Sequence, residues 1–317
     1  MTTRPGTIVV ALGGNALAPA GERADIHVQF AHTRESLSAV VALAQEGWHI
    51  AIVHGNAPQV GDALVRNELA RERVEPLPLG VLVASTAGWI GYMIQQSLQN
   101  ALHKVGVRRE VLTVITQTKV DRGGALAKPT KHIGHALEPD QVERLKRRGA
   151  AVGQDGGGHW RRLAPSPEPE DVVEADAVRQ LVDDGKIVIA AGGGGPPVYL
   201  DDRLHWEGVD AVVDKDRVAA ILGGRLGADT LLILTNVDAV YRGWGTPHAK
   251  PLRHLSVDSA EELLDGEELG VGSMRPKVEA AVAFVRDGGG RAVIADLPDG
   301  LAAIRGEAGT TITGEME

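Results

Sequence analysis

The sequence predicts an α/β fold in which a mainly parallel β-sheet is covered by helices on both faces. Short apolar runs alternate with segments of helical periodicity along most of the chain, and two of these runs end in consecutive glycines. Repeated strand–helix–strand units require a parallel sheet with both faces covered. A chain of 317 residues can bury a substantial core, either as one large domain or as two smaller ones.

The first strand–helix–strand unit lies near the N-terminus. The apolar run Thr7–Leu12 predicts a buried strand, and apolar residues at helical spacing predict a helix within 30–44. Gly47 is placed to cap this helix, and 48–53 is the next expected strand. Further helices are expected at 81–103, 174–183, from about 217, and at 277–285, and further strands at 111–116, 187–191, 230–234 and 291–295.

The segment 121–169 interrupts this alternation. It is rich in Gly, Pro, Lys and His, and it contains one short charged helix candidate at 139–148. A segment of this length is too long for an ordinary loop in a compact domain. We therefore expect a single domain over 1–317, with a small subdomain or lid at 121–169 inserted in it.

Composition excludes several classes of function. The formal charge of −9 and the aromatic content of 3% argue against a nucleic-acid-binding surface. The absence of cysteine excludes disulfides, zinc–thiolate sites and a thiol nucleophile. No apolar run approaches the ~18 to 20 residues of a membrane helix, and residues 1–6 lack a signal-peptide core. We expect a soluble, cytoplasmic protein with no membrane partner.

Glycines at strand ends indicate phosphate binding. Consecutive glycines after a strand can leave amides free and let a phosphate approach without a Cβ in the way. A glycine pair alone is more often a tight turn, and neither the P-loop nor the G-x-G-x-x-G spacing occurs. Ligands bind beyond the carboxyl ends of parallel strands, so the polar strand ends should share one edge. These are Gly13-Gly14-Asn15, His54-Gly55-Asn56, Gln117, 192–195 and Thr235-Asn236.

Three lysines are candidates for phosphoryl-transfer chemistry. Lys131 lies in the inserted segment, Lys215 stands between two aspartates, and Lys277 lies at an expected helix start. Positioned ammonium groups can stabilise the charge that develops on a transferring phosphoryl group, and Asp216 would keep Lys215 charged and oriented. The alternative is a surface ion pair that contributes about 0–1 kcal/mol, and spacing alone does not decide between them.

Two further motifs allow two interpretations each. HGNAPQVG at 54–61 is either a substrate loop or a helix start with Asn56 as N-cap and Pro58 in the first turn, and both can hold together. The turn after the strand at 230–234 either lines a nucleotide base or simply ends the strand. The sequence has no H-E-x-x-H or G-x-S-x-G pattern, so metalloprotease and serine-hydrolase functions find no support.

Eight motifs in order, nearly end to end, resemble those of the carbamate kinases, members of the amino-acid kinase family. They are ALGGNAL at 11–17, HGNAPQVG at 54–61, KPTKHIG at 128–134, PSPEP at 165–169, AAGGGGP at 190–196, VDKD at 213–216, LTNVDAVY at 234–241 and GSMRPKVEA at 272–280. The resemblance implies a three-layer αβα sandwich with about eight strands, a protruding subdomain and a homodimer. It also implies reversible, Mg²⁺-dependent phosphoryl transfer between ATP and carbamate, giving ADP and carbamoyl phosphate, with ATP formation in arginine catabolism.

The resemblance also implies a role for each matching residue. The catalytic residues would be Lys131, Lys215, Asp216 and Lys277. Phosphate would be bound by Gly13, Gly14, Asn15, Gly193 and Gly194, and carbamate by Gly55, Asn56 and Lys131. The nucleotide would contact Thr235, Asn236, Val237, Tyr241 and Met274, and Mg²⁺ would be held through the nucleotide phosphates without a metal site on the protein.

Three positions depart from the pattern of this family. Ala57 stands where glycine is usual and is expected to narrow the substrate loop. Arg275 also stands where glycine is common and is expected to add a cation near the nucleotide. His132 stands where proline is usual and is expected to make the lid less rigid. Ala57 also leaves open a different small acid or phosphate as acceptor. A non-catalytic regulatory homologue is a third possibility, which the retained lysines disfavour.

Overall fold

The computed structural model describes residues 6–13, 17, 25–125, 128–266, 269 and 274–314. Its central feature is an eight-stranded sheet in the order β15-β17-β16-β12-β1-β2-β9-β3, in which only the β16–β17 pair is antiparallel. This confirms the expected sheet. Its strands are β1 (Thr7–Leu12), β2 (His49–His54), β3 (Val111–Thr113), β9 (Ile187–Ile189), β12 (Thr230–Thr235), β15 (His254–Ser256), β16 (Arg291–Asp296) and β17 (Thr310–Thr313).

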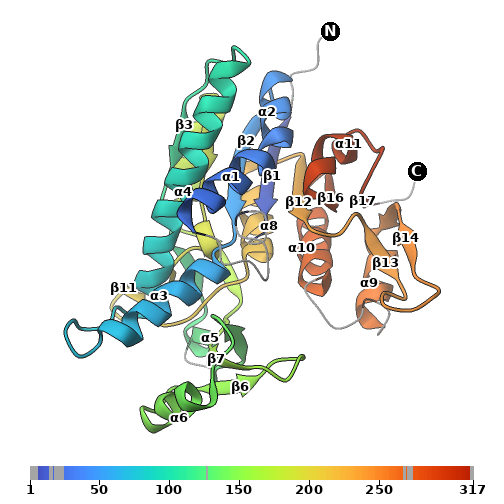
Figure 1. The fold of residues 1–317 in the computed structure, drawn as a ribbon. Helices are drawn as coiled ribbons and strands as arrows, with labels where there is room; N and C mark the ends of the chain where they lie inside the picture. The colour runs from blue at the N-terminus through green and yellow to red at the C-terminus, as the bar shows by residue number, and fades with distance from the viewer. Residues whose placement is uncertain are drawn as a thin grey trace.

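Helices cover both faces of this sheet (Figure 1). Side chains alternate along β1, so that Val9 faces one core, with α7, α8 and α10, while Val10 faces the other, with α2, α4 and α11. The three-layer αβα arrangement is thereby confirmed. The helices are α1 (Ile26–Ser36), α2 (Ser38–Gln45), α3 (Ala57–Ala70), α4 (Leu79–Lys104), α7 (Ala175–Asp183), α8 (Lys215–Leu226), α9 (Val257–Asp265), α10 (Met274–Arg286) and α11 (Gly300–Ile304).

Most expected elements agree with the structure to within a few residues, and three differ. The strand expected at 111–116 ends already at Thr113. The helix expected within 30–44 is two helices that meet at buried Leu37, because α1 packs against α4 while α2 packs against the sheet and α11. The strand expected at 187–191 ends at Ile189, since Ala191 has a left-handed backbone (φ 49°) that a strand cannot contain.

The inserted segment contains a small antiparallel sheet that protrudes below the main body in Figure 1. It consists of β5 (Lys131–Ile133), β7 (Trp160–Ala164) and β6 (Val152–Gln154), with α6 (Pro139–Arg147) following β5; α5 (Arg122–Ala125) precedes them. Another sheet joins β4 (Thr118–Val120), β8 (Pro169–Val172), β10 (Pro197–Leu200) and β11 (Trp206–Gly208). None of the described helices has the length and apolar character needed to span a membrane.

Candidate active site

The carboxyl ends of the central strands meet at one edge of the sheet, as expected. Leu12 at the end of β1 pairs with His54 at the end of β2 and with Leu234 near the end of β12. The loop after β9 forms a single 3₁₀ turn, η2 (Gly192–Gly194), beside the end of β2. Gln117 is different, because β3 has already ended at Thr113, and both its backbone amide and its side chain donate hydrogen bonds to Glu174.

Asp216 joins two of the three candidate lysines. Its carboxylate accepts Lys215 Nζ on Oδ1 at 2.6 Å and Lys277 Nζ on Oδ2 at 3.3 Å. Lys277 comes from α10, which packs along α8, so the contact depends on the pairing of these two helices. The Asp216 side chain is 4% exposed and those of Lys277 and Lys215 are 8% and 14% exposed. This is a nearly buried three-charge cluster, and the alternative of a surface ion pair is wrong.

The charges of this cluster determine its protonation. Burial raises the pKa of Asp216, but the charges of Lys215 and Lys277 and their hydrogen bonds outweigh burial and hold that pKa below its ordinary value. Burial also lowers the pKa of Lys277, an effect that Asp216 opposes and Lys215 reinforces. Asp216 is therefore ionised at neutral pH and stabilises the charged form of Lys277.

Asp214 connects the start of α8 to the inserted segment. Its Oδ1 accepts hydrogen bonds from the backbone amides of Asp216, at 2.9 Å, and Arg217, at 3.4 Å, which caps the helix. Its Oδ2 accepts Lys131 Nζ at 3.3 Å. Lys131 is the first residue of β5, so the third candidate lysine comes from the protruding sheet. Its partner Asp214 directly precedes Lys215 in the chain.

The loop after β2 interlocks with the glycines of η2. Asn56 is buried and donates from Nδ2 to Thr86 Oγ1 on α4 at 2.9 Å, so its side chain does not cap α3. A Cβ on Gly193 would lie 2.0 Å from Asn56 Nδ2, and Gly193 also has a positive φ of 68°. A Cβ on Gly194 would lie 2.7 Å from the Val213 carbonyl oxygen, just before α8. Glycine at these positions thus permits close contact between the two loops and α8.

The expectation of free amides at the consecutive glycines is wrong for Gly13 and Gly194, and the amide of Gly55 is bonded as well. The Gly13 amide donates to the Leu234 carbonyl and the Gly55 amide to the Leu12 carbonyl, each at 3.0 Å, so both continue the sheet ladder. The Gly194 amide donates to the Ala191 carbonyl at 2.9 Å. These glycines contribute close approach, because their amides are already bonded. Gly14 and Asn15 lie outside the described residues.

The expected nucleotide-binding residues lie after β12 and at the start of α10. Thr235 ends β12, Asn236 is exposed, and Val237 is half-buried in the following turn. Tyr241 donates its hydroxyl to Asp238 at 2.9 Å, and this hydrogen bond raises the pKa of Tyr241. Met274 is the first residue of α10, the helix that carries Lys277, and it packs against the core.

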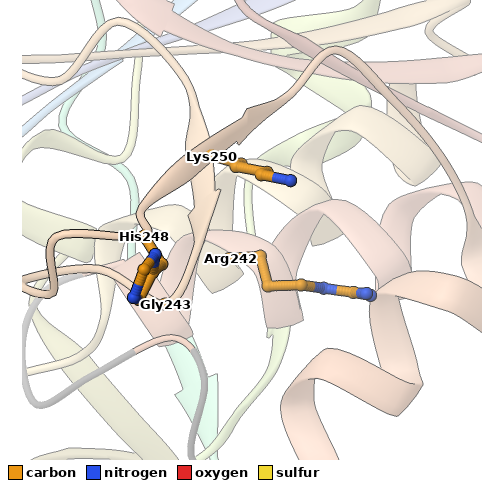
Figure 2. A pocket seen from close by; sticks show the side chains of 4 residues that line it. All are labelled: Arg242, Gly243, His248 and Lys250. Carbon is orange, nitrogen blue, oxygen red and sulfur yellow. The ribbon is translucent and has the colours of Figure 1, made fainter.

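A pocket beside this turn was not predicted from the sequence. Strands β13 (Val240–Arg242) and β14 (Lys250–Leu252) form an antiparallel hairpin, with Arg242 directly opposite Lys250. Arg242, Gly243, His248 and Lys250 line a cavity of about 470 Å³ (Figure 2). The sequence does show three basic residues, Arg242, His248 and Lys250, within nine positions directly after Tyr241, and this clustering could have indicated the pocket.

The inserted segment contacts α3 through ion pairs that the sequence does not predict. His135 Nε2 lies 2.7 Å from an Asp62 carboxylate oxygen, and Glu68 binds Arg148 at 2.5 Å and Arg162 at 3.5 Å. The backbones come close where a Cβ on Gly61 would lie 2.8 Å from Gly134 Cα. These pairings join residues far apart in the chain, so only the folded arrangement reveals them.

The structure places the three departing residues as follows. Ala57 is the exposed first residue of α3. The Arg275 guanidinium donates to the carbonyls of Leu264, at 2.5 Å, and Gly266, at 2.9 Å, and so binds the C-terminal end of α9. The expectation that it adds a cation near the nucleotide stays a prediction. His132 Nε2 lies 2.9 Å from the Gln154 carbonyl oxygen, a contact within the protruding sheet that proline could not make.

The sequence is similar to that of known proteins of the amino acid kinase family. The model of the amino acid kinase family matches residues 6–296. A carbamate kinase from Pyrococcus horikoshii is 40% identical over 313 residues, which cover 98% of this chain and 99% of the relative. A carbamate kinase from Clostridium perfringens is 41% identical over 312 residues, covering 96% and 99%.

Solved structures agree with these relatives. A carbamate kinase from Giardia lamblia bound to AMP-PNP superimposes with a TM-score of 0.90 at 32% identity, covering 98% of both chains. A protein from Aeropyrum pernix superimposes with a TM-score of 0.91 at 34% identity, covering 97% of this chain and 99% of that one.

Proposed function

The chain belongs to the amino acid kinase family and has carbamate kinase function, and we propose how its residues carry out the reaction. A carbamate oxygen attacks the γ-phosphorus of ATP, the bond from that phosphorus to the β–γ bridging oxygen breaks, and ADP and carbamoyl phosphate form. In the reverse direction a β-phosphate oxygen of ADP attacks the phosphorus of carbamoyl phosphate. The attacking groups are already anions, so no proton needs to be removed.

The observation that carries this proposal is the cluster of Lys215, Asp216 and Lys277. Phosphoryl transfer spreads negative charge over the transferring group, and fixed ammonium groups stabilise that charge most in a site that excludes water. Lys215 and Lys277 fit this role because Asp216 orients both. Lys131 would contact carbamate, which its origin in the protruding sheet supports.

We assign the remaining residues to the substrates by their place at the sheet edge. Gly13, Gly193 and Gly194 would line the phosphates as bare backbone, and Gly14 and Asn15, which follow Gly13 in the chain, would bind phosphate with them. Gly55 and Asn56 would lie against carbamate. They adjoin the first turn of α3, where no side chain caps the backbone amides, so these amides can bind an anion. The nucleotide would contact Thr235, Asn236, Val237, Tyr241 and Met274.

Magnesium fits this site as part of the nucleotide complex. Within the described residues no three His, Asp or Glu side chains come together as a metal site, and both Asp216 oxygens already bind ammonium groups. Mg²⁺ usually keeps several waters and binds through substrate phosphates. It would enter with ATP or ADP and neutralise phosphate charge, and chelation by EDTA should abolish turnover until Mg²⁺ is restored.

We further propose that 121–169 is a lid inserted in a single domain. The separate three-stranded sheet and the contact of Lys131 with Asp214 support this division. The lid would bring Lys131 over carbamate. We expect the enzyme to act in the cytoplasm, with ATP and ADP as co-substrates.

A homodimer is the assembly that we propose. In the central sheet β3 is an edge strand, and exposed apolar side chains lie beside it: Ile115 is 52% exposed and Tyr92, on α4, 55% exposed. Gly88, one helical turn before Tyr92, lies against Ile115, so the two side chains belong to one patch. Light scattering should give twice the chain mass for the wild type and a lower mass for Ile115→Glu.

The test of function is ATP formation from ADP and carbamoyl phosphate by purified protein with Mg²⁺. ATP above the blank supports the proposal, and none contradicts it. In the other direction, ADP release is compared with carbamate, acetylglutamate and small phosphates as acceptors. A preference for a larger acid or a phosphate would replace carbamate as the acceptor.

A further inference from the structure

His54 is a buried polar residue that the phosphoryl-transfer chemistry does not use. It ends β2 immediately before Gly55 and Asn56, and its side chain has no exposed surface. Its Nδ1 lies 3.0 Å from the Gly55 carbonyl oxygen. Its Nε2 makes no hydrogen bond within the part of the chain that the structure describes. A carbonyl oxygen can only accept, and the Gly55 carbonyl is the stronger of the two backbone groups that act on the ring, the other being that of Ala87, so the neutral ring carries its proton on Nδ1.

This hydrogen bond fixes the orientation of the peptide group that follows. No peptide bond in the described chain is cis, and in a trans peptide the carbonyl and the next amide point in opposite directions. With the Gly55 carbonyl held toward the buried ring, the amide of Asn56 points to the other side. That amide has no acceptor among the described residues, and it precedes the first turn of α3.

The ring cannot easily turn away from this position. A Cβ on Gly192 would lie 2.6 Å from His54 Nε2 and 2.8 Å from the Ala87 side chain, so the ring is packed between η2 and α4. The Asn56 side chain is fixed as well, through Thr86 on the same helix. Rotation of the Gly55–Asn56 peptide would therefore have to break the bond to Nδ1 without gaining another partner in the core.

We propose, building on the carbamate kinase function, that His54 is a positioning residue for carbamate: its Nδ1–H holds the Gly55 carbonyl so that the Asn56 amide faces the anionic oxygens of carbamate or carbamoyl phosphate. His54 itself touches neither substrate. A hydrogen bond to a charged group contributes enough affinity that its loss weakens binding by about 10- to 100-fold. The nucleotide, which we place beyond other strand ends, should keep its affinity.

Four variants test this role through the Michaelis constants in the ATP-forming direction. His54→Phe keeps the ring and loses the bond, and it should raise KM for carbamoyl phosphate about tenfold or more while KM for ADP changes less than twofold. His54→Asn places its amide where Nδ1 stands and should restore KM, whereas His54→Gln, longer by one bond, should not. His49→Phe is the matched control, since His49 on the same strand binds the Val182 carbonyl at 2.7 Å near the opposite end.

The outcomes separate this proposal from the function on which it rests. Equal rises of both KM values in His54→Phe, or equal KM values for His54→Asn and His54→Gln, overturn the positioning role. If His54→Phe does not fold, the Asn and Gln pair still decides. A wild type without ATP formation instead contradicts the carbamate kinase function. In that case ¹⁵N NMR tests the geometry alone. The imidazole signals that are missing in His54→Asn belong to His54, and they should show the proton on Nδ1. A proton on Nε2 overturns the inference.

Discussion

Lys215 and Lys277 share a single carboxylate, each binding a different oxygen of Asp216, although they lie on different helices. Two ammonium groups this close would repel each other in a nearly buried site, and Asp216 compensates one of the two charges. The three residues together keep a charge of +1. A protein with a formal charge of −9 thus presents a local positive site to anionic substrates.

Replacing Asp216 by Asn should destabilise the protein and inactivate it. The change leaves Lys277 buried beside an uncompensated Lys215, and removing one partner of a buried ion pair typically costs on the order of 3 kcal/mol. We expect the free energy of unfolding in urea at pH 7 to fall by about this amount. Turnover should fall as well, since neither lysine remains oriented.

Asp258→Asn is the matched control for that experiment. The Asp258 side chain is 90% exposed and lies 3.9 Å from Arg286, a contact that contributes almost nothing. We expect wild-type stability and turnover from this variant. Asp216→Asn with the same unfolding free energy as Asp258→Asn would mean that the buried lysines do not depend on the carboxylate.

Replacing Lys215 by Ala should reduce kcat about 100- to 1000-fold and leave the fold intact. One positioned group that stabilises transition-state charge typically contributes that factor. The helix should persist because Asp214 still caps it and alanine favours helix. Lys119→Ala is the control, since Lys119 forms an exposed ion pair with Glu170 at 2.8 Å. Equal kcat values for the two variants would assign the chemistry to other residues.

The sequence was informative about the sheet and less so about how the site is held. Apolar runs and glycine caps predicted the central strands, because burial on both faces makes parallel strands apolar throughout. The sequence could mark Lys215 and Lys277 as candidates, but their common partner depends on how α8 packs on α10. The bonded amides of Gly13 and Gly55 were not predictable either, since the ladder extends one residue past each strand only in the folded sheet.

The protein should lose stability as the pH falls from 6.5 to 4, because of His54. Burial lowers the pKa of His54 to about 4, against the opposing effect of the Gly55 and Ala87 carbonyls. Between these values the unfolded chain binds a proton at this residue and the folded chain does not, so unfolding takes up a proton and becomes easier. The difference between a pKa of 6.5 in the unfolded chain and about 4 in the folded chain corresponds to roughly 3 kcal/mol, reached near pH 4.

Urea unfolding at pH 7, 6 and 5 measures this effect in the wild type and in His54→Asn. Asparagine does not titrate, so the variant should lose less stability over the same range. Asp216 adds no slope there, because its pKa lies below the ordinary 3.8 and its contribution is lost only at lower pH. Parallel pH profiles for the two proteins would show that His54 does not titrate differently on unfolding.

Replacing Glu68 by Gln should loosen the inserted segment from α3 without affecting the core. Glu68 on α3 pairs with Arg148 and Arg162 of that segment, and its side chain is 25% exposed. Loss of its charge should weaken this attachment by about 1 kcal/mol, so that cleavage within 121–169 by a protease at native conditions becomes several times faster. KM for carbamoyl phosphate should rise together with the cleavage rate, because Lys131 is carried on the same segment.

Asp140→Asn is the control, because it breaks an ion pair with Arg144 inside α6, at 2.8 Å, and should change neither the cleavage rate nor KM. Equal cleavage rates in the two variants would show that Glu68 does not hold the segment.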